Sequence, residues 1–211
     1  MGKVDRRFQG ILLIAVSLLF VGIYSLSALE SHNIEGYLIC IAPDDNGNIK
    51  IEAEFTECAG NIALVNLENE IYTISGTQNY IDKLNDAPKR RMGVLMDQNV
   101  TGTLHGHKRA LHMMAGSSKY IDEGKTEKIK GTIYCLFPDY KKSYMNYKLT
   151  NKPCYSARPH AHFLHTEDNE IIAITGSEEH IKHVESATER KDVYLTGSIS
   201  GSKYSRYINL K

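Results

Sequence analysis

The fold is decided by two related stretches of sequence, GYLICIAPD at residues 36–44 and GTIYCLFPD at residues 131–139. Glycine, cysteine, proline and aspartate recur in them at an offset of 95 residues. A second pair, NEIYTISG at 69–76 and NEIIAITG at 169–176, has an offset of 100. A third pair, DQNVTGTLHG at 97–106 and DVYLTGSISG at 192–201, returns to the offset of 95. Three pairs in the same order indicate a tandem duplication of one module.

The duplication divides the chain into four segments. Residues 1–30 are predicted to be an N-terminal membrane anchor or signal peptide, residues 34–116 the first module, and residues 131–211 the second. The polar stretch between the modules, SSKYIDEGKTEKIK at residues 117–130, is predicted to be a linker.

Each module is predicted to be mainly β with one short helix. In the second module, residues 161–165 and 170–175 have the pattern of a strand, a turn and a strand. Ser177 is a predicted helix N-cap, and Ile181 and Val184 follow it at helical spacing. Thr77, Ile81 and Leu84 repeat that signal in the first module. Two further strands, at residues 193–200 and 204–211, are expected after the helix.

This order of strands, one helix and two strands resembles the oligonucleotide/oligosaccharide-binding (OB) fold, a five-stranded Greek-key barrel. More narrowly, each module is similar to small exported bacterial OB modules. The resemblance rests on the hairpin from Phe163 to Ile174 and on the V-x-L-x-G-x-I strand from Val193 to Ile199. It implies two tandem OB-like barrels that act as binding modules. A long segment carrying the second cysteine of each module departs from the pattern and leaves the strand count open.

The N-terminal segment from Phe8 to Leu29 contains no charged residue. A helix of this length rises about 33 Å and can cross a hydrocarbon core of about 30 Å. Basic residues precede the segment and Glu30 follows it, so the positive-inside rule predicts an N-terminus in the cytoplasm and everything after Glu30 outside. A cleaved signal peptide is the alternative, because Ser25 and Ser27 suit a signal peptidase. Either interpretation places the modules in a periplasmic or extracellular compartment.

The four cysteines all follow this segment. Four cysteines allow three disulfide pairings. Cys40 and Cys58 are 18 positions apart and Cys135 and Cys154 are 19 apart, which favours one disulfide within each module. A four-thiolate zinc site is disfavoured because neither pair has the close C-x-x-C spacing.

Charge and motifs argue against two classes of function. The chain has 25 Lys and Arg against 25 Asp and Glu, and nucleic-acid binding requires a surplus of cations. The shared acids Glu70 and Glu170 stand at expected strand ends, where acids are usually turn residues. The nucleophile motif G-x-S-x-G is absent. We therefore expect neither a nucleic-acid partner nor an enzyme.

Histidine is the remaining signal, because eight of the nine histidines lie in three groups. Residues two apart on a strand share a face, so His105 with His107, and His160 with His162, can each present two imidazoles to one side. If these strands meet between the modules, the four imidazoles form a Zn(II) or Cu(II) site, with His165 or Met113 as spare ligands. The alternative is a solvated polar strand face, since the two pairs do not correspond in the repeat.

These features predict a membrane-anchored exported binding or assembly module, an accessory subunit that associates with other proteins of a larger membrane complex. The 13 tyrosines support it, because tyrosine is favoured at protein interfaces. The competing interpretation is an exported carrier of metal (Cu or Zn) or of haem.

Overall fold

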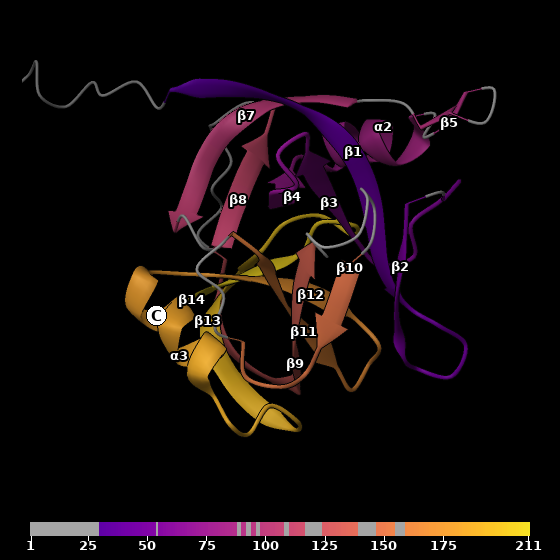
Figure 1. The fold of residues 1–211 in the computed structure, drawn as a ribbon. Helices are drawn as coiled ribbons and strands as arrows, with labels where there is room; N and C mark the ends of the chain where they lie inside the picture. Colours follow the sequence, from indigo (N-terminus) through magenta and orange to yellow (C-terminus); the bar gives the residue numbers. More distant parts are fainter. Residues whose placement is uncertain are drawn as a thin grey trace, which may run out of the picture. The chain divides into compact units, whose positions relative to one another are not determined.

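The computed structural model describes residues 30–53, 55–87, 90–91, 94–95, 98–107, 110–116, 124–138, 147–154 and 159–211, with the backbone alone for 90, 91, 94, 95, 106 and 107. These residues form two closed five-stranded β-barrels in tandem, each with one helix (Figure 1). We refer to residues 31–116 as barrel 1 and residues 124–211 as barrel 2.

Barrel 1 is closed by its first strand. Its strands are β1 (Ser31–Pro43), β3 (Asn61–Asn66), β4 (Ile71–Gly76), β8 (Ala110–Ala115) and β7 (Gln98–His107), in this spatial order. β1 pairs with β7 through Ser31–Gly36 and with β3 through Gly36–Ile41, so one long curved strand joins both ends of the sheet (Figure 1). The short β2 (Ile49–Glu52) extends the sheet on the other side of β1. A hairpin of β5 (Arg90–Arg91) and β6 (Val94–Leu95) precedes β7.

Barrel 2 repeats this topology. Its order is β9 (Thr126–Pro138), β11 (Ala161–Thr166), β12 (Ile171–Thr175), β14 (Tyr207–Leu210) and β13 (Val193–Ser200), closed by β9 with β13 and extended by β10 (Tyr147–Thr150). β4 pairs with β8, and β12 with β14, in parallel. One parallel pair in an otherwise antiparallel barrel, with a helix before the fourth strand, is consistent with the predicted small OB-like barrels.

The strand registers confirm the repeat residue by residue. Gly36 faces Asn66 across β1 and β3, and Gly131 faces Thr166 across β9 and β11. Gly102 faces Ala115 in barrel 1, and Gly197 faces Leu210 in barrel 2. The two offsets seen in the sequence therefore correspond to equivalent pairs of hydrogen-bonded strands.

The predicted helices are α2 (Gln78–Asp86) and α3 (Glu178–Ser186). Thr77 caps α2 by accepting from the Tyr80 amide, and Ser177 caps α3 by accepting from the His180 amide. Buried side chains from one face of each helix join the core of its own barrel; they are Ile81, Leu84, Ile181 and Val184.

Both faces of several strands are buried, because the barrels share an apolar interface. Leu38 and Cys40 of β1 point into barrel 1, whereas Ile39 and Ile41 belong to a separate apolar cluster. Barrel 2 contributes to that cluster from alternate positions of its first strands; the residues are Leu136, Ala161, Phe163, Ile171 and Ala173. Alternation along a strand thus sends one set of side chains to the barrel core and the other to the interface.

The element boundaries depart from the sequence segments at two places. β1 begins at Ser31, before the predicted start of the first module at residue 34. β9 begins at Thr126, inside the stretch 117–130 that was expected to be a linker. Residues 126–131 of β9 pair with β13, and this pairing extends the first strand of barrel 2 into the polar stretch.

The predicted transmembrane helix is not found, since no described helix has both the length and the apolar character that a membrane span requires. The segment from Phe8 to Leu29 itself lies outside the described residues.

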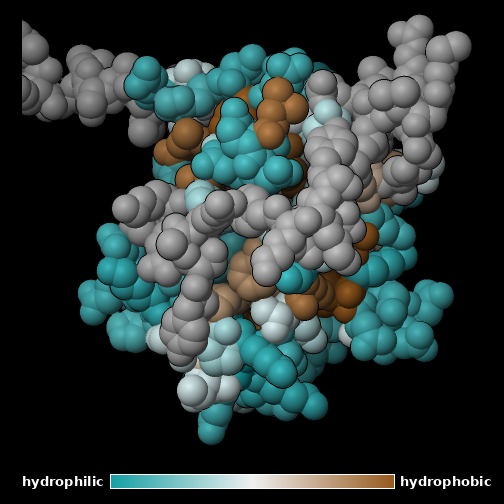
Figure 2. All heavy atoms as spheres, viewed as in Figure 1, coloured by the Kyte–Doolittle hydropathy of each residue, from teal (hydrophilic) through white to brown (hydrophobic). Residues whose placement is uncertain are grey.

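The described surface offers little continuous apolar area in the view of Figure 2, where hydrophilic residues predominate and hydrophobic ones form small separate areas. Among the described residues, Leu67 and Tyr194 are the large hydrophobic side chains classed as exposed, each at 58%.

Candidate functional site

The structure contains both predicted disulfides, one in each barrel. Cys40 is bonded to Cys58 and Cys135 to Cys154. Each disulfide joins the first strand of its barrel to the segment that follows it. All four cysteines are therefore oxidised in this structure.

The disulfide of barrel 2 lies in a buried cluster of possible metal ligands. Cys135, Cys154, His160 and His162 place one donor atom each within 4.8 Å of the others. Each of these four residues is at most 3% exposed. His162 lies directly opposite Cys135 in the β9–β11 pairing, and its Nε2 is 3.6 Å from Cys154 Sγ. The ring centroids of His160 and His162 are 4.4 Å apart.

The local sequence explains why these side chains are inside. His162 and Leu164 are two residues apart on β11, and Leu164 belongs to the core of barrel 2. His160 lies one residue before β11, and because it is two positions from His162 it lies on the same side of the strand. The alternative of a solvated polar face therefore does not apply to this pair, because both residues are 0% exposed.

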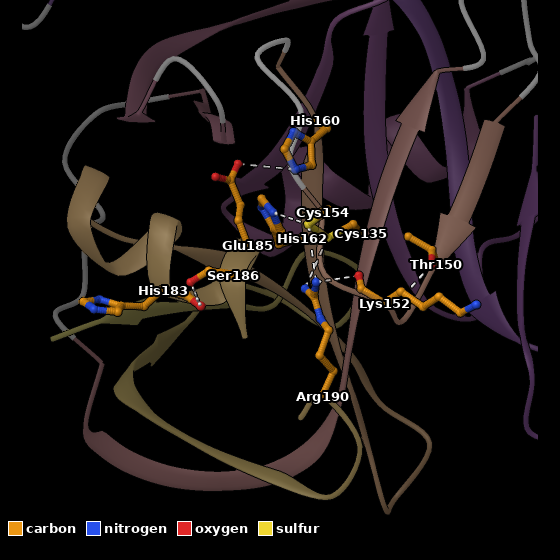
Figure 3. Close-up of a disulfide and its surroundings, with 10 residues drawn as sticks. All are labelled: Cys135, Thr150, Lys152, Cys154, His160, His162, His183, Glu185, Ser186 and Arg190. Atoms are coloured by element: carbon orange, nitrogen blue, oxygen red, sulfur yellow. Dashed lines mark hydrogen bonds and ion pairs between the residues drawn. A yellow bond between two sulfur atoms is a disulfide. The ribbon is translucent and has the colours of Figure 1, made fainter. Parts of the chain in front are cut away.

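Two buried charged residues complete the cluster. Arg190 donates to Cys135 Sγ at 3.2 Å, to Cys154 Sγ at 3.4 Å and to the carbonyl of Lys152 at 2.8 Å. Glu185 Oε1 lies 3.5 Å from His160 Nε2. Figure 3 shows the guanidinium directed at the two sulfurs, and Glu185 and His160 directed at each other. Burial lowers the pKa of Arg190, and the charge of Glu185 opposes this effect.

No sequence motif assigned a role to Arg190 or Glu185, although the sequence contained one signal. Glu185 follows Ile181 by four positions, on the apolar face of the predicted helix. A charged residue at such a position is buried when the helix packs. The structure shows Glu185 at 3% exposed and Arg190 at 2%.

Barrel 1 provides an internal comparison. Gly60 and Ile62 occupy the repeat positions of His160 and His162, and Asn85 occupies that of Glu185. Asn85 Oδ1 accepts a hydrogen bond from the Cys58 amide at 2.9 Å, and the Cys154 amide donates to the backbone carbonyl of Glu185 at 2.9 Å. The two disulfides thus sit in equivalent places, but among the described side chains only that of barrel 2 has imidazoles beside it.

The predicted site of four histidines is not assembled by the described side chains. His105, on β7, faces His112 across the β7–β8 pairing, and its Nε2 lies 2.9 Å from Thr103 Oγ1. His107 also lies on β7, but its side chain is outside the described part. His160 and His162 are instead buried beside the disulfide of barrel 2, and a site that includes His107 stays a prediction.

The two predicted spare ligands also lie elsewhere. Met113 is fully buried in the core of barrel 1. His165 has its Nε2 3.2 Å from Asn169 Oδ1, at the turn after β11. Neither belongs to the ligand group of barrel 2.

A cleft of about 670 Å³ lies between the barrels. Both barrels contribute to its lining, with Ser75, Gly76, Thr77, Gln78 and Met114 from barrel 1 and Ile199, Ser200, Gly201, Ser202 and Tyr207 from barrel 2. A smaller cavity of about 160 Å³ shares Met114 and Tyr207 with the cleft and includes His105 and His112 in its lining.

His112 is held as a neutral imidazole beside this cavity. Thr73 Oγ1 lies 2.7 Å from its Nδ1 and Ser75 Oγ 2.8 Å from its Nε2. Complete burial, followed by the charge of His105, lowers its pKa to about 3. Its ring packs against that of Tyr207 with centroids 4.7 Å apart.

The acids shared by the modules have structural partners. Glu70 accepts hydrogen bonds from Asn66 Nδ2 and from the hydroxyl of Tyr72. Glu170 forms an ion pair with Arg206 at 2.5 Å. These contacts agree with the expectation that both glutamates are turn residues.

No family model, curated protein or solved structure matches the chain in the comparisons with known proteins. The topology supports the OB-like fold, and the site geometry is what supports a function. The Cys/His cluster has donor atoms suited to a metal, but a disulfide occupies both sulfurs. Binding of haem stays a prediction.

Proposed function

We propose that this chain is an exported binding and assembly module, held at the membrane by its N-terminal segment, and an accessory subunit of a larger membrane protein complex. The cleft between the barrels carries this proposal. Ligand sites occur preferentially at domain interfaces and have volumes of about 300–1,000 Å³. A cleft of about 670 Å³ lined by both barrels has these properties.

The chemistry of the cleft favours an uncharged segment of a partner protein. The described lining residues are hydroxyl, amide, glycine and apolar residues, and none of them is charged. Thr77, Gln78 and Ser202 can exchange hydrogen bonds with a peptide backbone. Met114, Ile199 and Tyr207 add apolar contact area. A phosphate or nucleic-acid ligand requires cations that this lining does not provide.

The location outside the cytoplasm is supported by the disulfides and by the N-terminal sequence. Disulfides persist in oxidising compartments such as the periplasm and the cell exterior. The apolar stretch 8–29, with basic residues before it, suits an anchor that leaves the barrels outside. The proposal gives the chain a binding role and no reaction of its own.

Site-specific photo-crosslinking in native membranes tests the role of the cleft. A photoreactive residue is placed at Gln78, which lines the cleft, and at the matched control Asn79, the next residue of α2, which is exposed and outside the lining. We expect one discrete crosslinked partner protein when the photoreactive residue replaces Gln78. Equal crosslinking at both positions, or none at Gln78, excludes the cleft as the partner site.

A fractionation experiment tests the membrane part independently. We expect the full chain to remain in the membrane pellet after alkaline carbonate extraction and to be released only by detergent. A chain recovered in the soluble fraction with its first residues removed identifies the segment as a cleaved signal peptide.

Carriage of Cu or Zn is a second candidate function, favoured by the position of His160 and His162 beside two sulfurs. In the oxidised protein we propose binding by the two imidazoles alone. Metal analysis and a visible spectrum of the protein, purified without reductant, test this. Metal content that is equal in the wild type and the His162→Ile variant counts against it.

A further inference from the structure

We propose that reduction of the Cys135–Cys154 disulfide converts the cluster in barrel 2 into a Cys₂His₂ zinc site, with Cys135, Cys154, His160 and His162 as its ligands. The inference does not depend on the partner-binding role. It rests on four donors brought together by separate elements and on the absence of equivalent imidazoles beside the disulfide of barrel 1.

The distances suit a tetrahedral site after a small adjustment. Zinc binds thiolate at about 2.3 Å and imidazole at about 2.0–2.1 Å, so its ligands lie roughly 3.3–3.8 Å from one another. The four donors here lie within 4.8 Å, and the contact of Cys154 Sγ with His162 Nε2 is 3.6 Å. Breaking the S–S bond lets the sulfurs separate to the distance that zinc requires.

The backbone places the ligands without help from the disulfide. Cys135 and His162 are opposite each other in the β9–β11 pairing. The amide of Cys154 is bonded to the carbonyl of Glu185 near the end of α3. His160 is next to the first residue of β11. These hydrogen bonds persist when the sulfurs are reduced, so the ligands stay near one another.

The charged residues around the cluster suit the metal-bound state. Arg190 donates to both sulfurs, and such hydrogen bonds stabilise negative charge on thiolates. Two thiolates balance the charge of Zn²⁺. The carboxylate of Glu185 lies beside His160, as in the carboxylate–histidine–zinc arrangement that orients a ligating imidazole.

The reaction balances with a dithiol as reductant. Two electrons and two protons from the dithiol cleave the S–S bond and give two thiols, while the dithiol becomes a disulfide. Zn²⁺ then displaces the two thiol protons and binds both sulfurs as thiolates. Exchange with a small-molecule disulfide, which takes up the two electrons and becomes two thiols, re-forms the S–S bond and releases the metal.

Cobalt(II) replaces zinc as a spectroscopic probe in the test. The full chain in detergent is reduced with dithiothreitol, desalted without oxygen and titrated with Co(II), then with Zn(II) in competition with a chromophoric chelator. After reduction we expect one tightly bound Co(II) per chain with tetrahedral d–d bands, and a thiolate-to-cobalt charge-transfer band that the oxidised protein does not show. The double variant Cys40→Ser/Cys58→Ser is the matched control and keeps this binding, since it removes only the disulfide of barrel 1.

The remaining variants assign the ligands. The Cys135→Ser/Cys154→Ser variant loses the charge-transfer band. His162→Ile, which introduces the residue found at the matched position of barrel 1, weakens zinc binding at least about tenfold. Glu185→Gln weakens it about 10- to 100-fold, as is typical of residues that orient a ligand.

The proposal is overturned if the reduced wild type binds Co(II) no better than Cys135→Ser/Cys154→Ser, or if it binds equally well before reduction. Circular dichroism of each reduced variant shows whether it is folded. Because the oxidised and reduced wild type are compared directly, the result does not depend on any variant that fails to fold.

Discussion

His112 of barrel 1 and Tyr207 of barrel 2 pack against each other, with ring centroids 4.7 Å apart, and they occupy the same position of the repeat, 95 residues apart. Each lies on the last strand of its barrel and pairs with an equivalent residue, His112 with Thr73 and Tyr207 with Ala173. A contact between equivalent positions is what an approximate twofold axis produces. The two modules therefore meet as the subunits of a symmetric dimer do, although one chain carries both.

The pKa of His112 predicts a loss of stability in acid. The folded-state pKa of about 3 lies below the ordinary value of 6.5, so only the unfolded chain takes up this proton between those values. Stability contributed by neutral His112 is complete above pH 6.5 and is lost as the pH falls toward 3, with a slope of up to about 1.4 kcal/mol per pH unit. Denaturant unfolding at a series of pH values measures the slope.

Two variants separate His112 from the other titrating groups. His112→Gln should be less stable at neutral pH but should show a shallower pH slope. Thr196→Ala, which replaces an exposed side chain of β13 that does not titrate, should keep the wild-type slope. His105 faces His112 and also has a pKa lowered by burial, so a smaller slope should remain after His112 is replaced. Identical slopes in wild type and His112→Gln contradict the prediction.

The shared interface predicts that the barrels stabilise each other. Phe163 is 0% exposed and lies in the apolar cluster between the barrels. Phe163→Ala should lower the free energy of unfolding by about 3–5 kcal/mol. Hydrogen exchange should also become faster at Ile39 and Ile41 of barrel 1, whose side chains belong to the same cluster. The exposed Leu67 is the control, and Leu67→Ala should have little effect.

The recurring glycines predict a purely steric effect. A Cβ on Gly197 would lie 2.5 Å from the carbonyl oxygen of Asn209, and one on Gly102 would lie 2.2 Å from that of Met114. Gly197→Ala should therefore cost about 1–3 kcal/mol of stability, as overpacking does. Thr196→Ala, at the exposed neighbouring position, should be close to neutral. A Gly197→Ala protein as stable as the wild type would falsify this explanation.

The disulfide of barrel 1 should be structural. Cys40 and Cys58 close a loop with a sequence separation of 18, so Cys40→Ala/Cys58→Ala should lose about 3 kcal/mol in the chain-entropy description. Thermal or denaturant unfolding of the double variant measures this loss. Peptide mapping without reductant should recover Cys40 with Cys58 and Cys135 with Cys154. A peptide joining Cys40 to Cys135 contradicts the pairing of one disulfide within each barrel.

The sequence by itself determined the features that depend on neighbours along the chain or on the repeat. Thr77 and Ser177 cap helices because a cap is a contact between residues three apart. The disulfides could be predicted because the similar spacings of 18 and 19 residues in the two copies favour one disulfide in each. The strands of the repeated blocks could also be predicted, because the alternation of apolar and polar residues is a local property of the chain.

Only the tertiary structure decided where each strand face points and what lies opposite it. Ile39 and Ile41 face the other barrel rather than solvent because a second module covers that side of β1. His160 and His162 lie inside barrel 2 because closure by β13 encloses the face they share with Leu164. Arg190 reaches the sulfurs from 55 and 36 residues away. Such contacts join residues distant in sequence, so no local pattern specifies them, and the folded barrels alone bring them together.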